Sequence, residues 1–151
     1  MKVLAATAAL CLGIACAAAP AGKPTEKDAV AMVERAAAFM KAKGKDALGK
    51  RISARNPAFC RGALYLDMRD FKTGITLAHP YSPWLAGKDL TDVPDVNGKM
   101  FRREIIELAA TKGKGWVDYM YRNPASGKIE PKTTYILRVD EVVLEAGIYK
   151  K

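Results

Sequence analysis

The sequence is organised around Gly113-Lys114-Gly115-Trp116-Val117-Asp118-Tyr119-Met120-Tyr121, which is followed eleven residues later by Lys132-Thr133-Thr134-Tyr135. The first stretch predicts a strand that follows a helix and ends in a turn, and the second predicts the next strand of the same sheet. A mixture of Tyr hydroxyls, aromatic walls and one ammonium group suits a concave site for a small anion. The alternative is that the aromatic side chains are sheet core and the Lys is solvated, because aromatic residues are common on half-buried strands.

Outward from this pair, the sequence predicts three further strands. Residues 63–68 and 75–79 alternate as two strands joined by a turn, and residues 142–149 form a strand after the one at 132–139. Residues 98–112 have the apolar spacing of a helix that Gly113 ends. We expect a helix from residue 27 to Gly44 with Thr25 as its N-cap, and a second one over residues 45–52. Residues 80–95 are a long loop of the kind that covers a binding site.

Length and charge limit the class of protein. The chain has 151 residues, enough for one domain with its own core, and a formal net charge of +9. The basic residues are scattered and form no long Lys/Arg run, which favours a solubilising surface over a nucleic-acid interface. Nucleic acid is therefore not an expected partner.

The N-terminus has the pattern of a secretory signal peptide. Met1-Lys2 precedes an apolar run, and Ala17-Ala18-Ala19-Pro20-Ala21 offers small residues for cleavage. We therefore expect residues 1–21 to be a signal peptide and the mature protein to be periplasmic or secreted, with no transmembrane segment after cleavage. A spanning helix is the weaker interpretation because the run is short. Lipidation at Cys16 is a second alternative, although the usual Leu three residues earlier is missing.

The sequence offers little for catalysis or metal binding. Cys11 and Cys16 belong to the leader, which leaves Cys60 without a disulfide partner, and His79 is the one histidine. There is no Gly-x-Ser-x-Gly motif and no Cys/His cluster. We expect no enzyme activity, no metal and no cofactor. The stretch 95–99 superficially resembles a calcium loop but lacks the distal Glu, so we interpret it as a loop that leads into a helix.

Several short stretches, in their joint order, resemble the single Cache domain family (type 2), the extracytoplasmic relatives of PAS domains. The stretches are Gly62-Ala63-Leu64-Tyr65-Leu66, Leu77-Ala78-His79-Pro80, Leu85-Ala86-Gly87-Lys88-Asp89-Leu90, Asp95-Val96-Asn97-Gly98-Lys99, residues 113–121, Asn123-Pro124, residues 127–132, Tyr135 and Ala146-Gly147-Ile148-Tyr149. The resemblance covers residues 25–150, which we interpret as one domain. It implies an α+β, PAS-like fold with a long N-terminal helix packed on an antiparallel sheet of five or six strands. We expect a stand-alone exported form, because no signalling region follows Lys151.

The resemblance also implies a small-ligand pocket between the sheet and the loop–helix segment that covers it. The predicted ligand-binding residues are Tyr65, His79, Trp84, Trp116, Tyr119, Tyr121, Lys132 and Tyr135. Strand alternation places Tyr119 and Tyr121 on one face and Trp116 on the other, where it could be core instead. It also places Lys132 and Tyr135 on opposite faces unless Pro131 or a bulge redirects the Lys. His79 could instead be a structural residue at a strand end, and Lys88 could close over an anion or be solvated.

The expected function is that of an exported sensor-type domain whose ligand is a small organic acid. In this hypothesis Lys132 pairs with the carboxylate, Tyr hydroxyls donate to its oxygens, and the rings cover the short carbon chain. The alternative is a periplasmic interaction module that docks on a membrane sensor or another envelope protein and binds no small ligand.

Overall fold

A computed structural model describes residues 22–150. The predicted signal peptide, residues 1–21, lies outside the described residues. Within residues 22–150, no helix combines the length and the apolar character that crossing a membrane requires.

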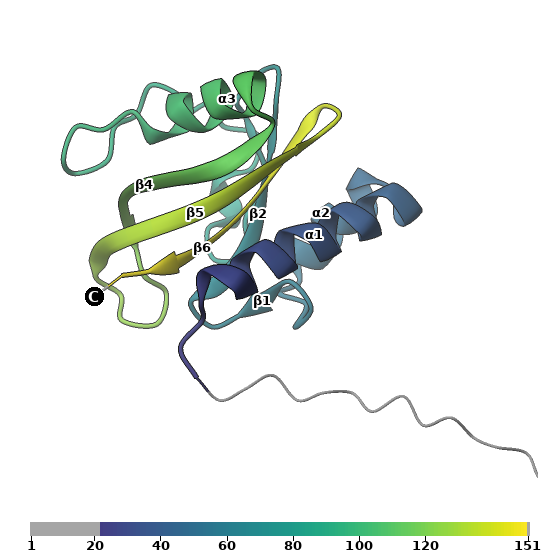
Figure 1. The fold of residues 1–151 in the computed structure, drawn as a ribbon, viewed down its shortest axis with the longest axis horizontal. Helices are drawn as coiled ribbons and strands as arrows, with labels where there is room; N and C mark the ends of the chain where they lie inside the picture. The colour runs from purple at the N-terminus through teal and green to yellow at the C-terminus, as the bar shows by residue number, and fades with distance from the viewer. Residues whose placement is uncertain (1–21, 151) are drawn as a thin grey trace, which may run out of the picture.

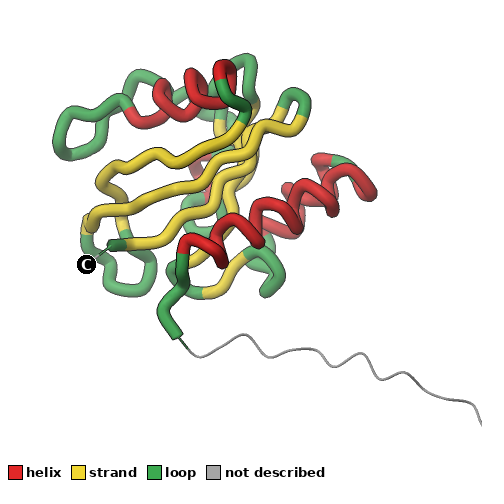
Figure 2. Tube along the Cα trace, viewed as in Figure 1, coloured by secondary structure: helices red, strands yellow, loops and turns green. Residues whose placement is uncertain are grey.

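The fold is α+β, as predicted, and places helices on both faces of one antiparallel sheet (Figure 1). The elements are α1 (Glu26–Lys43), α2 (Lys45–Ser53), β1 (Cys60–Arg61), β2 (Leu64–Asp70), β3 (Thr76–Ala78), the 3-10 helix η1 (Pro83–Leu85), α3 (Phe101–Thr111), β4 (Lys114–Arg122), β5 (Ile129–Val139) and β6 (Val142–Tyr149). The strand order is β1-β2-β6-β5-β4, with β3 paired to β2. Helices α1 and α2 lie on one side of the sheet and α3 on the other, as Figure 2 also shows.

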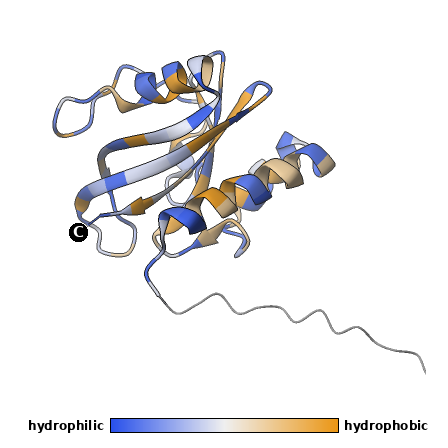
Figure 3. Ribbon diagram, in the orientation of Figure 1, coloured by the Kyte–Doolittle hydropathy of each residue, from blue (hydrophilic) through white to orange (hydrophobic). Residues whose placement is uncertain are grey.

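The long N-terminal helix begins and ends where its sequence predicts. The Thr25 hydroxyl accepts from the Asp28 backbone N–H, and the Asp28 carboxylate accepts from the Thr25 N–H at 2.8 Å, which completes a capping box. Gly44 ends the helix with a φ of 88°. Hydrophobic and hydrophilic residues both occur along α1 and along the strands (Figure 3), as expected for elements with one buried face.

Alternation along the central strands separates two environments. On β2, Leu64, Leu66 and Met68 belong to the apolar cluster that includes the buried face of α1. The residues between them, Tyr65, Asp67 and Arg69, point to the opposite side, under α3. The sheet therefore has a conventional core on its α1 face and a polar, buried region on its α3 face.

Strand β4 forms one edge of the sheet, and the loop before α3 occupies part of that edge. The Asp95 carboxylate accepts from the Met120 backbone N–H at 2.8 Å, and Lys99 Nζ donates to the Asp118 carbonyl at 2.6 Å. The same Asp95 side chain accepts from the backbone N–H groups of Asn97 and Lys99. Residues 95–99 thus fix the entry to α3 against the edge strand, as a loop leading into a helix.

Most predicted elements differ from the observed ones by a few residues at their ends, and two differences concern the strands β1 and β5. The short strand β1 was not expected, because two residues carry no periodic pattern. Strand β5 begins at Ile129 rather than at residue 132, so it includes Pro131. A Pro has no backbone N–H, and it is tolerated at this position because the sheet requires no donor there. The Pro131 carbonyl accepts from the Lys150 N–H at 2.8 Å, beyond the end of β6.

Candidate functional site

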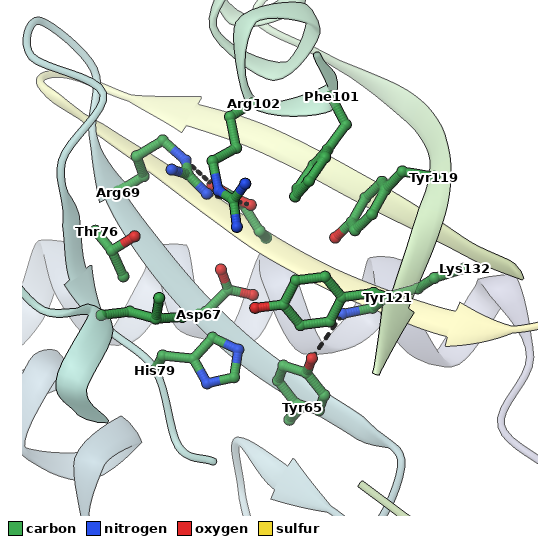
Figure 4. A pocket seen from close by; sticks show the side chains of 12 residues that line it. Tyr65, Asp67, Arg69, Thr76, His79, Phe101, Arg102, Tyr119, Tyr121 and Lys132 are labelled. Atoms are coloured by element: carbon green, nitrogen blue, oxygen red, sulfur yellow. Dashed lines mark hydrogen bonds and ion pairs between the residues drawn. The ribbon is translucent and has the colours of Figure 1, made fainter. Parts of the chain in front are cut away.

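A small cavity lies between the α3 face of the sheet and the segment that covers it (Figure 4). We call residues 80–100, which include η1, the covering segment. The cavity has a volume of about 10 Å³, which is room for about one water molecule. It is lined by residues from the sheet, η1 and α3, namely Tyr65, Asp67, Arg69, Thr76, His79, Leu85, Phe101, Arg102, Tyr119, Tyr121, Lys132 and Glu145.

The structure brings together five of the eight residues predicted from the sequence. Tyr65, His79, Tyr119, Tyr121 and Lys132 all line the cavity. Tyr119 and Lys132 are paired positions on β4 and β5, so their side chains lie on the same face of the sheet.

The other three predicted residues lie elsewhere. Trp116 and Tyr135 are paired across β4 and β5 on the α1 face, with their rings 5.2 Å apart, because alternation turns them away from Lys132. Tyr135 packs against the cluster under α1. Trp84 is 62 % exposed on η1, and Lys88 Nζ lies over its ring at 5.0 Å. We do not retain these three residues, or Lys88, as contacts of a ligand in this cavity.

Lys132 is a buried cation surrounded by phenol rings. Its Nζ donates to the Tyr65 hydroxyl at 3.0 Å, and its exposed fraction is 2 %. Its Nζ also lies 4.1–5.9 Å from four aromatic rings, those of Tyr65, Tyr119, Tyr121 and Tyr149. Burial lowers the pKa of Lys132 to about 8, although Asp67 and Glu145 act in the other direction. An ammonium carries three N–H donors, so two of them are left for a ligand.

The stem of Lys132 passes over Gly147, whose missing side chain leaves the space it needs. A Cβ built on Gly147 would lie 2.8 Å from Lys132 Cε and 2.6 Å from the Thr133 carbonyl, and it would also overlap the Thr134 hydroxyl. The Thr133 carbonyl is backbone of β5 and cannot move far, and the Thr134 hydroxyl is hydrogen-bonded to Tyr119 at 2.9 Å.

We therefore expect Gly147→Ala to lower the free energy of unfolding by about 1–3 kcal/mol, the cost typical of overpacking, and to displace the Lys132 ammonium. Chemical denaturation monitored by circular dichroism measures this. The matched control is Gly49→Ala in α2, where the new Cβ would be 3.8 Å from the Met68 sulfur, so its helix propensity should raise stability slightly. A Gly147→Ala protein as stable as wild type would show that this space is not needed.

Arg69 and Glu145 form a buried ion pair beside the cavity. Arg69 Nε lies 2.7 Å from Glu145 Oε1, and Arg69 Nη2 donates to Glu145 Oε2 at 3.4 Å. Arg69 Nη1 donates to the Gly74 carbonyl at 3.0 Å. Asp67 is the residue directly opposite Glu145 in the β2–β6 register. Burial raises the pKa of both carboxyl groups, and nearby cations, Lys132 for Asp67 and Arg69 for Glu145, counteract it.

Helix α3 contributes a second guanidinium from above. Arg102 is 8 % exposed, its Nη1 donates to the Val93 carbonyl at 3.1 Å, and its Cζ lies 4.2 Å from the Phe101 ring centroid. Burial lowers the pKa of Arg102. In Figure 4 its guanidinium points from α3 toward Asp67. Arg102 therefore connects the cavity to the covering segment through Val93.

His79 lines the cavity and also accepts hydrogen bonds from the backbone of the covering segment. Its Nδ1 accepts from the backbone N–H groups of Tyr81, at 3.2 Å, and Ser82, at 3.0 Å. Nδ1 is therefore an acceptor, and the proton of the neutral ring is on Nε2. Burial, followed by the charge of Lys132, lowers the pKa of His79 to about 3. His79 is thus a neutral donor at ordinary pH and does not need protonation to donate.

The cavity has an excess of positive charge. Its lining includes the three cations Arg69, Arg102 and Lys132 against the two carboxyl groups of Asp67 and Glu145, which leaves at least one positive charge. Across residues 22–150, no group of three or more His, Cys, Asp or Glu side chains is placed to hold a metal ion. The arrangement gathers N–H and O–H donors and an excess of positive charge around one covered cavity.

Comparisons with known proteins identify a family and several solved structures to which this chain is similar. The sequence model of the family described as Single Cache domain 2 matches residues 7–150. A solved periplasmic sensor domain of a chemotaxis protein is 25 % identical, with a TM-score of 0.65 over 83 % of this chain and 90 % of that one. A methyl-accepting chemotaxis protein from Vibrio parahaemolyticus is 26 % identical, with a TM-score of 0.70 over 82 % and 86 %.

A third solved structure shares the fold. It belongs to a Cache chemosensory domain described by its structural basis for carboxylic acid recognition. It is 23 % identical to this chain, with a TM-score of 0.67 over 83 % of this chain and 92 % of that one.

Proposed function

This chain belongs to the Single Cache domain 2 family, and on that premise we propose that it is an extracytoplasmic sensor-type domain that binds a small carboxylate in the cavity under α3. The observation that carries the proposal is the buried Lys132 ammonium, which among residues 22–150 has one hydrogen bond, to Tyr65, no salt bridge, and four phenol rings around it. A buried cation without a salt bridge is costly, and an anionic ligand would offset that cost.

The other lining groups support the same ligand class. Arg102, Tyr121 and Lys132 all line the cavity, and charge-assisted hydrogen bonds from cationic donors such as Arg102 and Lys132 are the strong ones. Phe101 and Tyr119, stacked with centroids 4.0 Å apart, give an apolar wall for a short carbon chain. The relative described by carboxylic acid recognition points to the same class.

The size of the cavity implies that the covering segment moves when a ligand enters. A volume of about 10 Å³ holds about one water, and an acid of two to four carbons is larger. The covering segment contributes Leu85, and it meets Arg102 at the Val93 carbonyl. An outward shift of residues 80–100 is therefore the expected route of entry.

Calorimetric titration with short carboxylates tests the proposal. We expect at least one of acetate, propionate, pyruvate, glycolate and lactate to bind and to raise the melting temperature by mass action. Lys132→Met should weaken that binding by about ten-fold or more, since a hydrogen bond to a charged group contributes about 1.5–3 kcal/mol.

The matched control is Lys114→Met, which removes an exposed lysine at the start of β4 and should leave the affinity unchanged. Binding that survives in Lys132→Met at wild-type strength would remove Lys132 from the site. A wild-type protein that binds none of these acids would contradict the proposed function.

A second candidate function is an interaction module for a membrane sensor or another envelope protein. It is favoured by the exposed apolar side chains of the covering segment, including Trp84 at 62 % and Val96 at 63 %. This function predicts that the protein ignores small acids and that a Trp84→Ala variant loses a co-purifying partner.

A further inference from the structure

Asp67 is a carboxyl acceptor in a cavity that is rich in N–H donors. Lys132, Arg102 and the neutral His79 ring all offer N–H groups, and the Glu145 carboxylate is held by Arg69. Asp67 forms no ion pair within 4.0 Å among residues 22–150, and its one hydrogen-bond partner there is the Glu145 carboxyl. A carboxyl group has two oxygens and room for several donors. Asp67 therefore retains acceptor capacity toward the cavity.

Asp67 also lies among the cations that would hold a ligand carboxylate. The charge that acts on it most is Lys132, followed by Arg69 and Arg102. Figure 4 shows its carboxyl directed to the space between Arg102, Tyr121 and His79. A carboxylate bound by these cations would bring the substituent on its neighbouring carbon next to Asp67.

We propose that Asp67 makes this site selective for short 2-hydroxy acids, with the ligand carboxylate on the cations and its hydroxyl donating to Asp67. The inference rests on the proposed function and names its ligand class more narrowly. A ligand hydroxyl would donate to Asp67, the lining carboxyl that no cation among residues 22–150 holds within ion-pair distance.

The charges of the lining favour 2-hydroxy acids over unsubstituted acids, 2-keto acids and amino acids. An unsubstituted acid leaves the Asp67 oxygens facing carbon, and a 2-keto acid sets its carbonyl oxygen against them. A zwitterionic amino acid brings an ammonium into a cavity that already has three cations against two carboxyl groups.

Calorimetry on matched ligand pairs tests the proposal. With the wild-type protein we expect glycolate to bind about ten-fold or more tightly than acetate, and lactate likewise relative to propionate, pyruvate and alanine. In Asp67→Asn, which preserves the shape of the side chain, the ratio of the glycolate affinity to the acetate affinity should fall about ten-fold, because the ligand hydroxyl loses its carboxylate acceptor. Circular dichroism confirms that the variant is folded.

Three results would overturn the inference. Equal wild-type affinities for glycolate and acetate would do so without any variant, and that comparison decides the matter if Asp67→Asn does not fold. A wild-type preference that Asp67→Asn retains in full would assign the hydroxyl to another group. If the wild-type protein binds no carboxylate at all, the proposed function fails with it, an outcome distinct from binding without selectivity.

Discussion

Replacing Arg69 with Met is expected to lower the free energy of unfolding by about 3–5 kcal/mol, the cost of leaving a buried charge without its partner. Arg69 and Glu145 are 3 % and 1 % exposed, and their paired atoms are 2.7 Å apart. Without the guanidinium, Glu145 would face Asp67 across the β2–β6 register with less positive charge nearby. Denaturation with urea, followed by circular dichroism, measures the loss.

Two further variants sharpen this test. Arg69→Met combined with Glu145→Leu removes both charges and should recover much of the loss, because an apolar replacement of a whole buried pair is often neutral. Arg103→Met breaks the Arg103–Asp92 pair, whose side chains are 53 % and 69 % exposed, and should change stability little. If Arg69→Met and Arg103→Met lowered the free energy of unfolding by equally small amounts, the buried Arg69–Glu145 pair would not be a principal source of stability.

Replacing Lys132 with Met is expected to have the opposite effect on the ligand-free protein and to raise the free energy of unfolding by about 1–3 kcal/mol. Burial lowers the pKa of Lys132 from 10.5 to about 8, which corresponds to about 3 kcal/mol against the charged form in the folded protein. Met fills a similar volume without a charge. The same substitution should remove carboxylate binding, so stability and binding should change in opposite directions.

The pH dependence of stability identifies Lys132 as the cause. The unfolded chain holds the lysine proton to a higher pH than the folded protein, so between about pH 8 and pH 10 it binds more protons, and stability rises with pH. Above about pH 10 the buried phenols act in the opposite sense, because burial raises the pKa of Tyr65, Tyr119, Tyr121 and Tyr149. The other ionisable groups facing Lys132 are His79, whose pKa burial lowers to about 3, and Asp67 and Glu145, whose pKa values burial raises.

Urea denaturation of wild type and Lys132→Met at pH 7.5, 9 and 10 measures the difference. Subtracting the two curves removes the contribution of the groups whose pKa does not depend on Lys132. A difference that stays constant across the three pH values would contradict the burial argument for Lys132.

Most of the fold is readable from local chemistry. Thr25 with Asp28, the glycines at 44 and 113, and the alternation of the strands each have a short-range physical cause, and the structure confirms the elements they predict. Alternation also separates Tyr119 and Tyr121 from Trp116 correctly. Strand β1 was missed because its existence depends on β2 and not on its own two residues.

The site was harder to predict, because alternation gives the face of a residue but not what covers it. On β2 the series Tyr65, Asp67, Arg69 alternates with Leu64, Leu66 and Met68, which normally indicates a solvated face. Here α3 and the covering segment bury that face, so Asp67, Arg69, Glu145 and Arg102 were not predicted. The sequence feature that could have indicated a buried polar site was Glu145, a charged residue in the centre of a strand of otherwise apolar or small residues. The direction of Trp84 could not be predicted either, because a loop has no period from which it follows; in the structure this side chain is exposed and does not line the cavity.

The contacts of Asp95 and Lys99 with β4 limit how this sheet can be extended. An open strand edge invites another chain to add a strand, and proteins prevent this with charged side chains and covering loops. Here one acidic and one basic side chain already occupy the Met120 N–H and the Asp118 carbonyl. A strand of another molecule that paired with β4 would first have to break both hydrogen bonds. Asp95 and Lys99 therefore disfavour self-association through β-sheet extension at this edge.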